Sequence, residues 1–119
     1  MMDSSRRFER LRARYAQSLA SKRAALREAW HACVATPELS TLHKLQVLVH
    51  RLSGSAPAYG YAALGRHASA IDRELMDWSA ADSTERDRAA DLVQRLSAPM
   101  QALIDELAHP ATAARHESN

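Results

Sequence analysis

The chain is poor in residues that interrupt helices and in residues that form cross-links. Its 119 residues include three glycines, four prolines and one cysteine. The single cysteine, Cys33, excludes an intramolecular disulfide and is typical of proteins from a reducing compartment. Aromatic residues make up only 5% of the chain, while alanine and aliphatic residues are abundant. This composition favours an all-α fold.

Long apolar runs are also missing. No stretch approaches the ~20 apolar residues that a transmembrane helix needs, and residues 1–14 lack the apolar centre of a secretory signal. We therefore expect a cytoplasmic protein without membrane contact. The length predicts one domain over residues 1–119, with a bundle core at about 22–108 and a frayed tail at 110–119.

The glycines are too few and too scattered for a phosphate-binding loop. Gly54, Gly60 and Gly65 do not form the glycine-rich motif that opens a helix in nucleotide-binding enzymes. We therefore expect no ATP binding and no kinase activity of its own. Cys33 lies on an apolar helical stripe, which predicts an inert core residue rather than a nucleophile.

Charge is unevenly distributed, although the net charge is only +2. Residues 1–31 hold eight Lys or Arg against three acids, and residues 68–108 hold four against nine. A basic arm that binds nucleic acid usually carries stacking aromatics or flexible glycines. Phe8 and Tyr15 are instead expected to be core contacts. We predict solvated helical faces of opposite sign and no nucleic-acid partner.

Apolar residues recur at spacings of three and four along most of the chain, as in amphipathic helices. The first stripe lies in an arginine-rich segment that either breaks near Ser18 and Ser21 or runs on to about Ala35. Three further stripes predict helices, namely Leu42, Leu45, Val49, Leu52 and Ala56; Tyr61, Leu64, Ala68, Ile71, Leu75 and Trp78; and Val93, Leu96, Met100, Leu103 and Leu107. Short loops favour an antiparallel up-down-up-down four-helix bundle with an additional N-terminal helical segment.

Proline, threonine and glycine predict where the helix that carries the Leu42–Ala56 stripe starts and ends. Thr36 as N-cap and Pro37 at the first helical position predict its start, because proline there loses no hydrogen bond. Pro57 removes a backbone donor and Gly60 permits a sharp turn, so the helix should end between them. The last helix is expected to be capped within residues 82–84.

His50 lies beside the buried stripe of its helix and not on it, so its imidazole should be exposed. The residue four positions later normally stacks over such a side chain. Here that residue is Gly54, although glycine costs up to about 1 kcal/mol in a helix interior relative to alanine. A small and costly neighbour indicates that something large must approach the ring.

The pattern around His50 resembles the histidine phosphotransfer (HPt) domain family. The matching residues are His50, Leu52, Gly54, Ser55, Ala56 and Gly60, followed by Ala63, Leu64, Ala68, Ile71 and Asp72. The resemblance covers roughly residues 22–107. It implies a phosphorelay protein that accepts and donates a phosphoryl group on His50. Two positions depart from the family pattern: Ser53 replaces the usual lysine, and Asp72 replaces the usual glutamate or glutamine.

The resemblance also implies roles for neighbouring residues. Asp72 would support the histidine by accepting a hydrogen bond from the ring nitrogen that does not react. Gly54 would admit the partner. Ser53 can offer at most one neutral hydrogen bond in place of the lysine charge. Phospho-His50 should therefore be less stabilised than in relatives with lysine, unless Arg51 or Arg66 supplies the positive charge.

The implied partners are response-regulator receiver domains or a hybrid sensor kinase. The receiver would supply Mg²⁺, so no cofactor and no metal site are expected in this chain, which should act as a monomer. The predicted docking surface surrounds His50 and consists of Val47, Arg51, Gly54 and Ala58. Gly60 is predicted to be a structural turn that ends the helix and allows the next helix to approach closely.

Two alternatives stay open at this point. Glu28-x-x-His31 and Glu106-x-x-His109 match the Glu-x-x-His motif of helical bundles that bind two metal ions, although these residues lie beside the inward-facing stripes. The second alternative is a helical adaptor that docks on a receiver or kinase without being phosphorylated. The absence of a lysine at position 53 is the reason to consider it.

Overall fold

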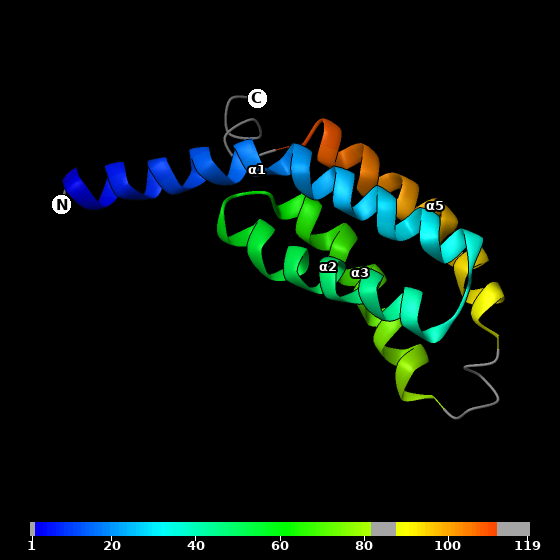
Figure 1. Cartoon of the computed structure of the whole chain (residues 1–119). Helices are drawn as coiled ribbons and strands as arrows, with labels where there is room; N and C mark the ends of the chain where they lie inside the picture. The colour runs from blue at the N-terminus through cyan, green and yellow to red at the C-terminus, as the bar shows by residue number, and fades with distance from the viewer. Residues whose placement is uncertain (1, 82–87, 112–119) are drawn as a thin grey trace.

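The computed structural model describes residues 2–81 and 88–111, and this part of the chain is almost entirely helical. Its helices are α1 (Met2–Ala35), α2 (Leu39–Ala58), α3 (Ala62–Ala80) and α5 (Ala89–Ala108). The chain direction alternates from each helix to the next, so neighbours are antiparallel (Figure 1). The predicted all-α, up-down-up-down four-helix bundle is confirmed.

The N-terminal segment is the first part of α1, and no break occurs at Ser18 or Ser21. The Ser18 hydroxyl donates to the Tyr15 carbonyl at 2.6 Å, so its polar group is satisfied within the helix. The first turns of α1 extend beyond the other helices (Figure 1). Tyr15 is buried as predicted. Phe8 is 47% exposed, and the expectation of a core contact there was wrong, because Phe8 lies on this overhang, where its ring stacks on Tyr59.

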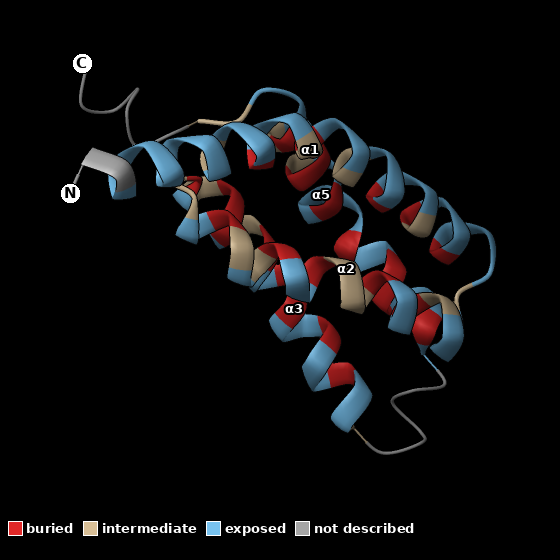
Figure 2. Cartoon of the chain, turned by 60° about the vertical axis from the view of Figure 1, so that its left-hand side comes forward, coloured by how far each residue is buried: buried red, intermediate tan, exposed pale blue. Residues whose placement is uncertain are grey.

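The buried residues face one another along the centre of the bundle (Figure 2). Every residue of the three predicted stripes on α2, α3 and α5 is buried, together with Leu26, Trp30 and Cys33 of α1. Burial of each large apolar side chain contributes roughly 1.5–3 kcal/mol to folding. His50 stands beside the α2 stripe, and its side chain is 68% exposed.

The α1–α2 connection differs from the prediction at Thr36 and Pro37. Helix α2 begins at Leu39 with Glu38 as its N-cap, two residues later than expected. The reason is the hydroxyl of Thr41, which accepts from the Glu38 amide at 3.3 Å and lies 2.6 Å from the Thr36 carbonyl, to which it donates. These contacts hold Thr36 and Pro37 in the turn that precedes the helix.

The α2–α3 turn forms where predicted. Helix α2 ends at Ala58, and Gly60 has a φ of +93°, a left-handed conformation that favours glycine. Close approach of the two helices, however, occurs at Gly65 and not at Gly60. A Cβ atom on Gly65 would lie 2.4 Å from Cγ of Pro57, whereas one on Gly60 would meet the Arg12 side chain.

Two expectations fall on parts of the chain that lie outside the described residues. These are the cap of the last helix at 82–84 and most of the tail, at 112–119; the described part of the last helix, α5, begins at Ala89. No helix in residues 2–81 or 88–111 combines the length and the apolar character needed to cross a membrane.

Candidate functional site

The ring of His50 is exposed, and one of its nitrogens shares a hydrogen bond with Asp72. The His50 side chain is 68% exposed, and its Nδ1 atom lies 2.9 Å from Oδ2 of Asp72 on α3. A carboxylate only accepts hydrogen bonds, so Nδ1 carries the hydrogen in this contact. The neutral ring then has its lone pair on Nε2. The structure thus brings together two of the residues singled out in the sequence, and aspartate is long enough to reach the ring.

Asp72 is placed at some energetic cost. It is the one charged residue that is buried in the described part of the chain, with its side chain only 11% exposed. Oδ2 contacts His50, but Oδ1 is buried and has no hydrogen-bond partner among the described residues. An unpaired buried acceptor typically costs about 1–3 kcal/mol. Such a cost is most often retained where a residue has a task other than stability.

Ser53 does not face the imidazole with its hydroxyl. Its Oγ atom donates to the carbonyl oxygen of His50 at 2.7 Å, one turn back on the same helix. Arg51 and Arg66, the two candidates for supplying a positive charge, are exposed. Neither makes a hydrogen bond or ion pair with His50 in the described structure. Among the residues that the structure describes, Asp72 is the one that shares a hydrogen bond with the His50 ring.

The residues of the predicted docking surface share one accessible side of α2. Arg51, Gly54 and Ala58 are exposed and Val47 is half-buried. A Cβ atom added to Gly54 would have no atom within 4 Å, so the space above it is open. The helix therefore leaves the approach to His50 unobstructed at the position where a side chain would normally stand.

Gly54 allows a test of this open approach. The resemblance to HPt domains implies phosphoryl transfer at His50. Replacing Gly54 with glutamine should slow such transfer from a protein donor at least tenfold, because a long side chain at this position would cover the ring. The same variant should be as stable as the wild type or slightly more so, since glycine is a poor helix former. Transfer rates and thermal midpoints measured side by side would check this. Equal transfer rates in the two proteins would remove the steric role assigned to Gly54.

The other candidate groups do not assemble into a site. In the part of the chain that the structure describes, no group of three or more His, Cys, Asp or Glu is placed to hold a metal ion. Glu106 instead accepts a hydrogen bond from the Ala111 amide at 2.8 Å. Cys33 is fully buried, and burial raises the pKa of its thiol. Ser55 points away from His50 and shares a 2.7 Å hydrogen bond with the Tyr15 hydroxyl.

The sequence analysis assigned no structural or functional role to two residues near the site, Gly65 and Lys22. Gly65 lies where α2 and α3 approach closely, but a lone glycine within a helix carries no signal of what it will face. Lys22 lies on α1 and lines a hollow that also includes Arg51. Its helical spacing from Ser18 is visible in the sequence, whereas its position opposite α2 depends on how the two helices pack.

Comparison with known proteins gives no family assignment. No protein-family model, curated protein or solved structure matches this chain. The function must therefore be argued from the residues and their geometry.

Proposed function

We propose that this protein is a histidine phosphotransfer protein, which accepts a phosphoryl group on His50 from an aspartyl phosphate of a receiver domain and passes it on. The observation that carries the proposal is an exposed histidine whose Nδ1 is bound to a buried carboxylate at 2.9 Å. The small residues around it and the resemblance of its sequence pattern to HPt domains add support.

The chemistry asks for one nucleophilic nitrogen in a fixed direction. Nε2 of His50 attacks the phosphorus, a P–N bond forms, and the P–O bond to the receiver carboxylate breaks with its electron pair going to that carboxylate. Phosphoryl transfer depends mainly on positioning and charge stabilisation. Asp72 contributes to both, because it fixes the ring and faces the positive charge that develops on the imidazole as Nε2 is phosphorylated.

We expect no kinase activity of the domain itself, because its sequence has no glycine-rich phosphate loop. The phosphoryl group would then come from a donor that is already phosphorylated. The domain therefore needs only to present His50 to a partner that supplies the metal ion and the remaining charge.

The test is direct labelling. The protein is mixed with a panel of phosphorylated receiver domains, and the label it acquires is mapped. We expect label on His50 that is lost in acid and stable in base, as for a P–N bond and unlike an aspartyl phosphate. Stable binding to a receiver without any transfer of label would instead favour the adaptor alternative.

Ser53 provides a second test, because it stands where the resemblance leads us to expect lysine. Ser53→Lys should shift the transfer equilibrium towards phosphorylated His50, since the ammonium one turn away can contact the phosphoryl oxygens. Such charge-assisted contacts contribute about 1.5–3 kcal/mol, less at an exposed position. The ratio of phospho-His50 to phospho-receiver is measured at two salt concentrations, and the shift should be larger at low salt. An unchanged ratio would mean that positive charge at position 53 is not limiting.

A further inference from the structure

A hollow lies on the surface of α3, close to the α2–α3 turn. It has a volume of about 440 Å³ and takes one lining residue, Pro57, from α2. The other lining residues belong to α3 and are Ala62, Gly65, Arg66, Ser69, Ala70 and Arg73. We call this the α3 hollow. Its volume is within the range of sites that bind small molecules.

Small residues leave the space for the α3 hollow. Gly65 is the one lining residue that is buried, and a Cβ atom there would lie 2.4 Å from Cγ of Pro57. Ala62 and Ala70 add only methyl groups. Side chains of this size leave room beside longer neighbours on the same side of the helix.

The polar lining consists of two arginines and a serine. Arg66, Ser69 and Arg73 follow one another at spacings of three and four, so they share one side of α3. They are exposed, and none of them makes a hydrogen bond or ion pair with another residue in 2–81 or 88–111. No acid is among the described residues that line the hollow. Two like charges in one hollow repel each other, and an anion placed between them removes that repulsion.

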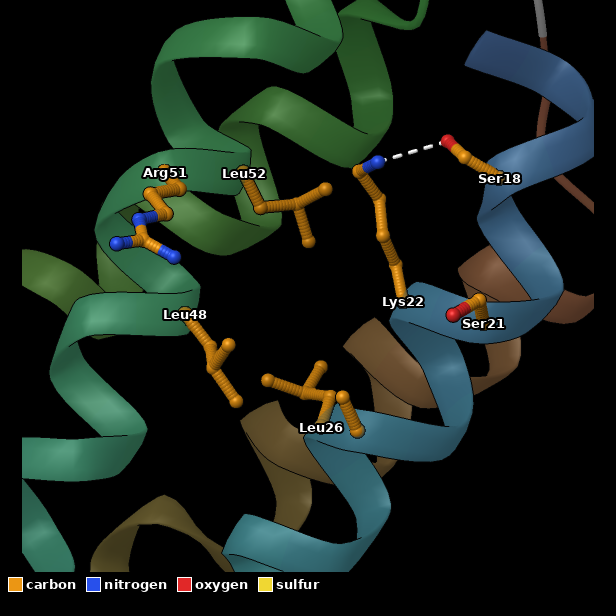
Figure 3. Close-up of a pocket in the computed structure, with 8 residues that line it drawn as sticks. Ser18, Ser21, Lys22, Leu26, Leu48, Arg51 and Leu52 are labelled. Atoms are coloured by element: carbon orange, nitrogen blue, oxygen red, sulfur yellow. Dashed lines mark hydrogen bonds between the residues drawn. The ribbon is translucent and has the colours of Figure 1, made fainter. Parts of the chain in front are cut away.

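The hollow between α1 and α2 has a different character. Leu26, Leu48 and Leu52 point into it, and the Lys22 ammonium already donates to the Ser18 hydroxyl at 2.7 Å (Figure 3). The α3 hollow instead offers two guanidinium groups and a hydroxyl that have no partner among the described residues. Such a lining favours a small anion over an apolar ligand.

Phosphate is the anion that this set of donors fits best. A guanidinium presents its N–H groups in a planar fork that matches two oxygens of a phosphate group, and a serine hydroxyl can donate to another. Arg66 and Arg73 stand about 10.5 Å apart along the helix axis, with Ser69 between them. The hollow is larger than a phosphate ion requires, which leaves room for an organic group against Pro57 and the two alanines.

We propose that the α3 hollow binds a small molecule that carries a phosphate group. Arg66 and Arg73 hold the phosphate from its two sides, and the Ser69 hydroxyl donates to it. Inorganic phosphate and small phosphate esters share this chemistry. The proposal does not depend on phosphoryl transfer at His50.

Titration of the full chain with inorganic phosphate tests the proposal, with sodium chloride of equal ionic strength as the reference. In NMR spectra, phosphate should shift the amides of Arg66, Ser69 and Ala70 saturably. Arg66→Gln and Arg73→Gln should each weaken binding at least threefold and the double variant at least tenfold, because each removes a charge-assisted contact at an exposed position.

Arg95→Gln is the matched control, because Arg95 is exposed on α5 and does not line the α3 hollow. It should bind phosphate within about twofold of the wild type. The absence of a saturable shift, the same shifts with chloride, or double-variant binding as tight as that of the control would each overturn the proposal.

The source of the phosphate group is decided by comparing inorganic phosphate, ribose 5-phosphate and ribose. Tighter binding of ribose 5-phosphate than of inorganic phosphate would identify a phosphate ester as the ligand, and equal affinity would assign the site to the phosphate ion. Ribose should not bind. Ribose that bound as tightly as ribose 5-phosphate would overturn the proposal, since the phosphate group would then contribute nothing.

Thermal unfolding gives a second readout. A ligand that binds only the folded chain stabilises it by mass action, so phosphate at about ten times its Kd should raise the thermal midpoint by several degrees. Phosphate also strengthens apolar burial in any protein, and that general effect would be equal in all variants. The site-specific rise should occur in the wild type and in Arg95→Gln and be absent from the Arg66→Gln, Arg73→Gln double variant. Equal rises in all three proteins would place the effect outside the hollow and contradict the proposal.

Discussion

Replacing His50 with glutamine is expected to abolish phosphoryl acceptance and leave the bundle folded. Glutamine has no ring nitrogen that can form the P–N bond, and its amide can still donate to Asp72. Since the His50 side chain is 68% exposed, its removal leaves no cavity in the core. The measurement is transfer of label from a phosphorylated receiver, together with helical circular dichroism and the thermal midpoint.

The informative comparison is with the other exposed histidines. His31→Gln, on α1, and His43→Gln, on α2, remove exposed imidazoles that have no carboxylate partner among the described residues, and both variants should accept label at the wild-type rate. Label that persists in His50→Gln would assign acceptance to another residue. The proposed function would then lose the observation on which it rests.

Replacing Gly65 with alanine is expected to destabilise the protein and to slow transfer as well. The new Cβ atom would lie 2.4 Å from Cγ and 2.8 Å from Cδ of Pro57. The proline ring is bonded to its own backbone and cannot rotate away, so the helices must move apart. Overpacking of this kind costs about 1–3 kcal/mol, which should lower the thermal midpoint by several degrees.

The expected loss of transfer follows from the geometry of the α2–α3 interface. Pro57 and Gly65 form one contact of the antiparallel pair, and His50 and Asp72 form another. Each residue of the first pair is seven positions from its counterpart in the second, or about 10.5 Å along the helix. Separating the helices at Gly65 should therefore lengthen the 2.9 Å contact that orients the imidazole.

Gly54→Ala is the matched control for this effect. It makes the same change in α2 where a Cβ atom meets nothing within 4 Å, so it should raise the free energy of unfolding by up to about 1 kcal/mol. If the two alanine variants changed stability equally, the close contact at Pro57 would not be the cause. A stable Gly65→Ala protein with normal transfer would contradict both parts of the prediction.

Local pattern and chemistry were enough for much of the fold. Every residue of the stripes predicted from the three- and four-residue spacings is buried, because a helix in water buries its apolar side. Leu92 and Ile104 of α5 are buried as well, although the predicted stripe did not include them. Gly60 was predicted as a turn since only glycine adopts a positive φ without strain. His50 was predicted to be exposed because it stands off the stripe, and its pattern with Gly54 is a property of one helix.

Contacts between helices were decided by the tertiary structure. Thr36 and Pro37 had the right chemistry for a helix start, yet hydrogen bonds of Thr41 placed that start at Leu39. Phe8 had the spacing of a core residue, but the first turns of α1 extend beyond the other helices, so Phe8 is exposed. Such outcomes depend on which elements lie opposite a residue, and helical periodicity does not contain that information.

The features of the candidate site also separate into those that belong to one helix and those that depend on how helices pack. The sequence by itself determined that His50 would be an exposed histidine beside small residues, since those features belong to one helix. Whether the short side chain of Asp72 could reach the ring depended on the separation of α2 and α3. The two helices approach closely where Gly65 meets Pro57, and the periodicity within one helix does not contain which residues of another helix it will meet.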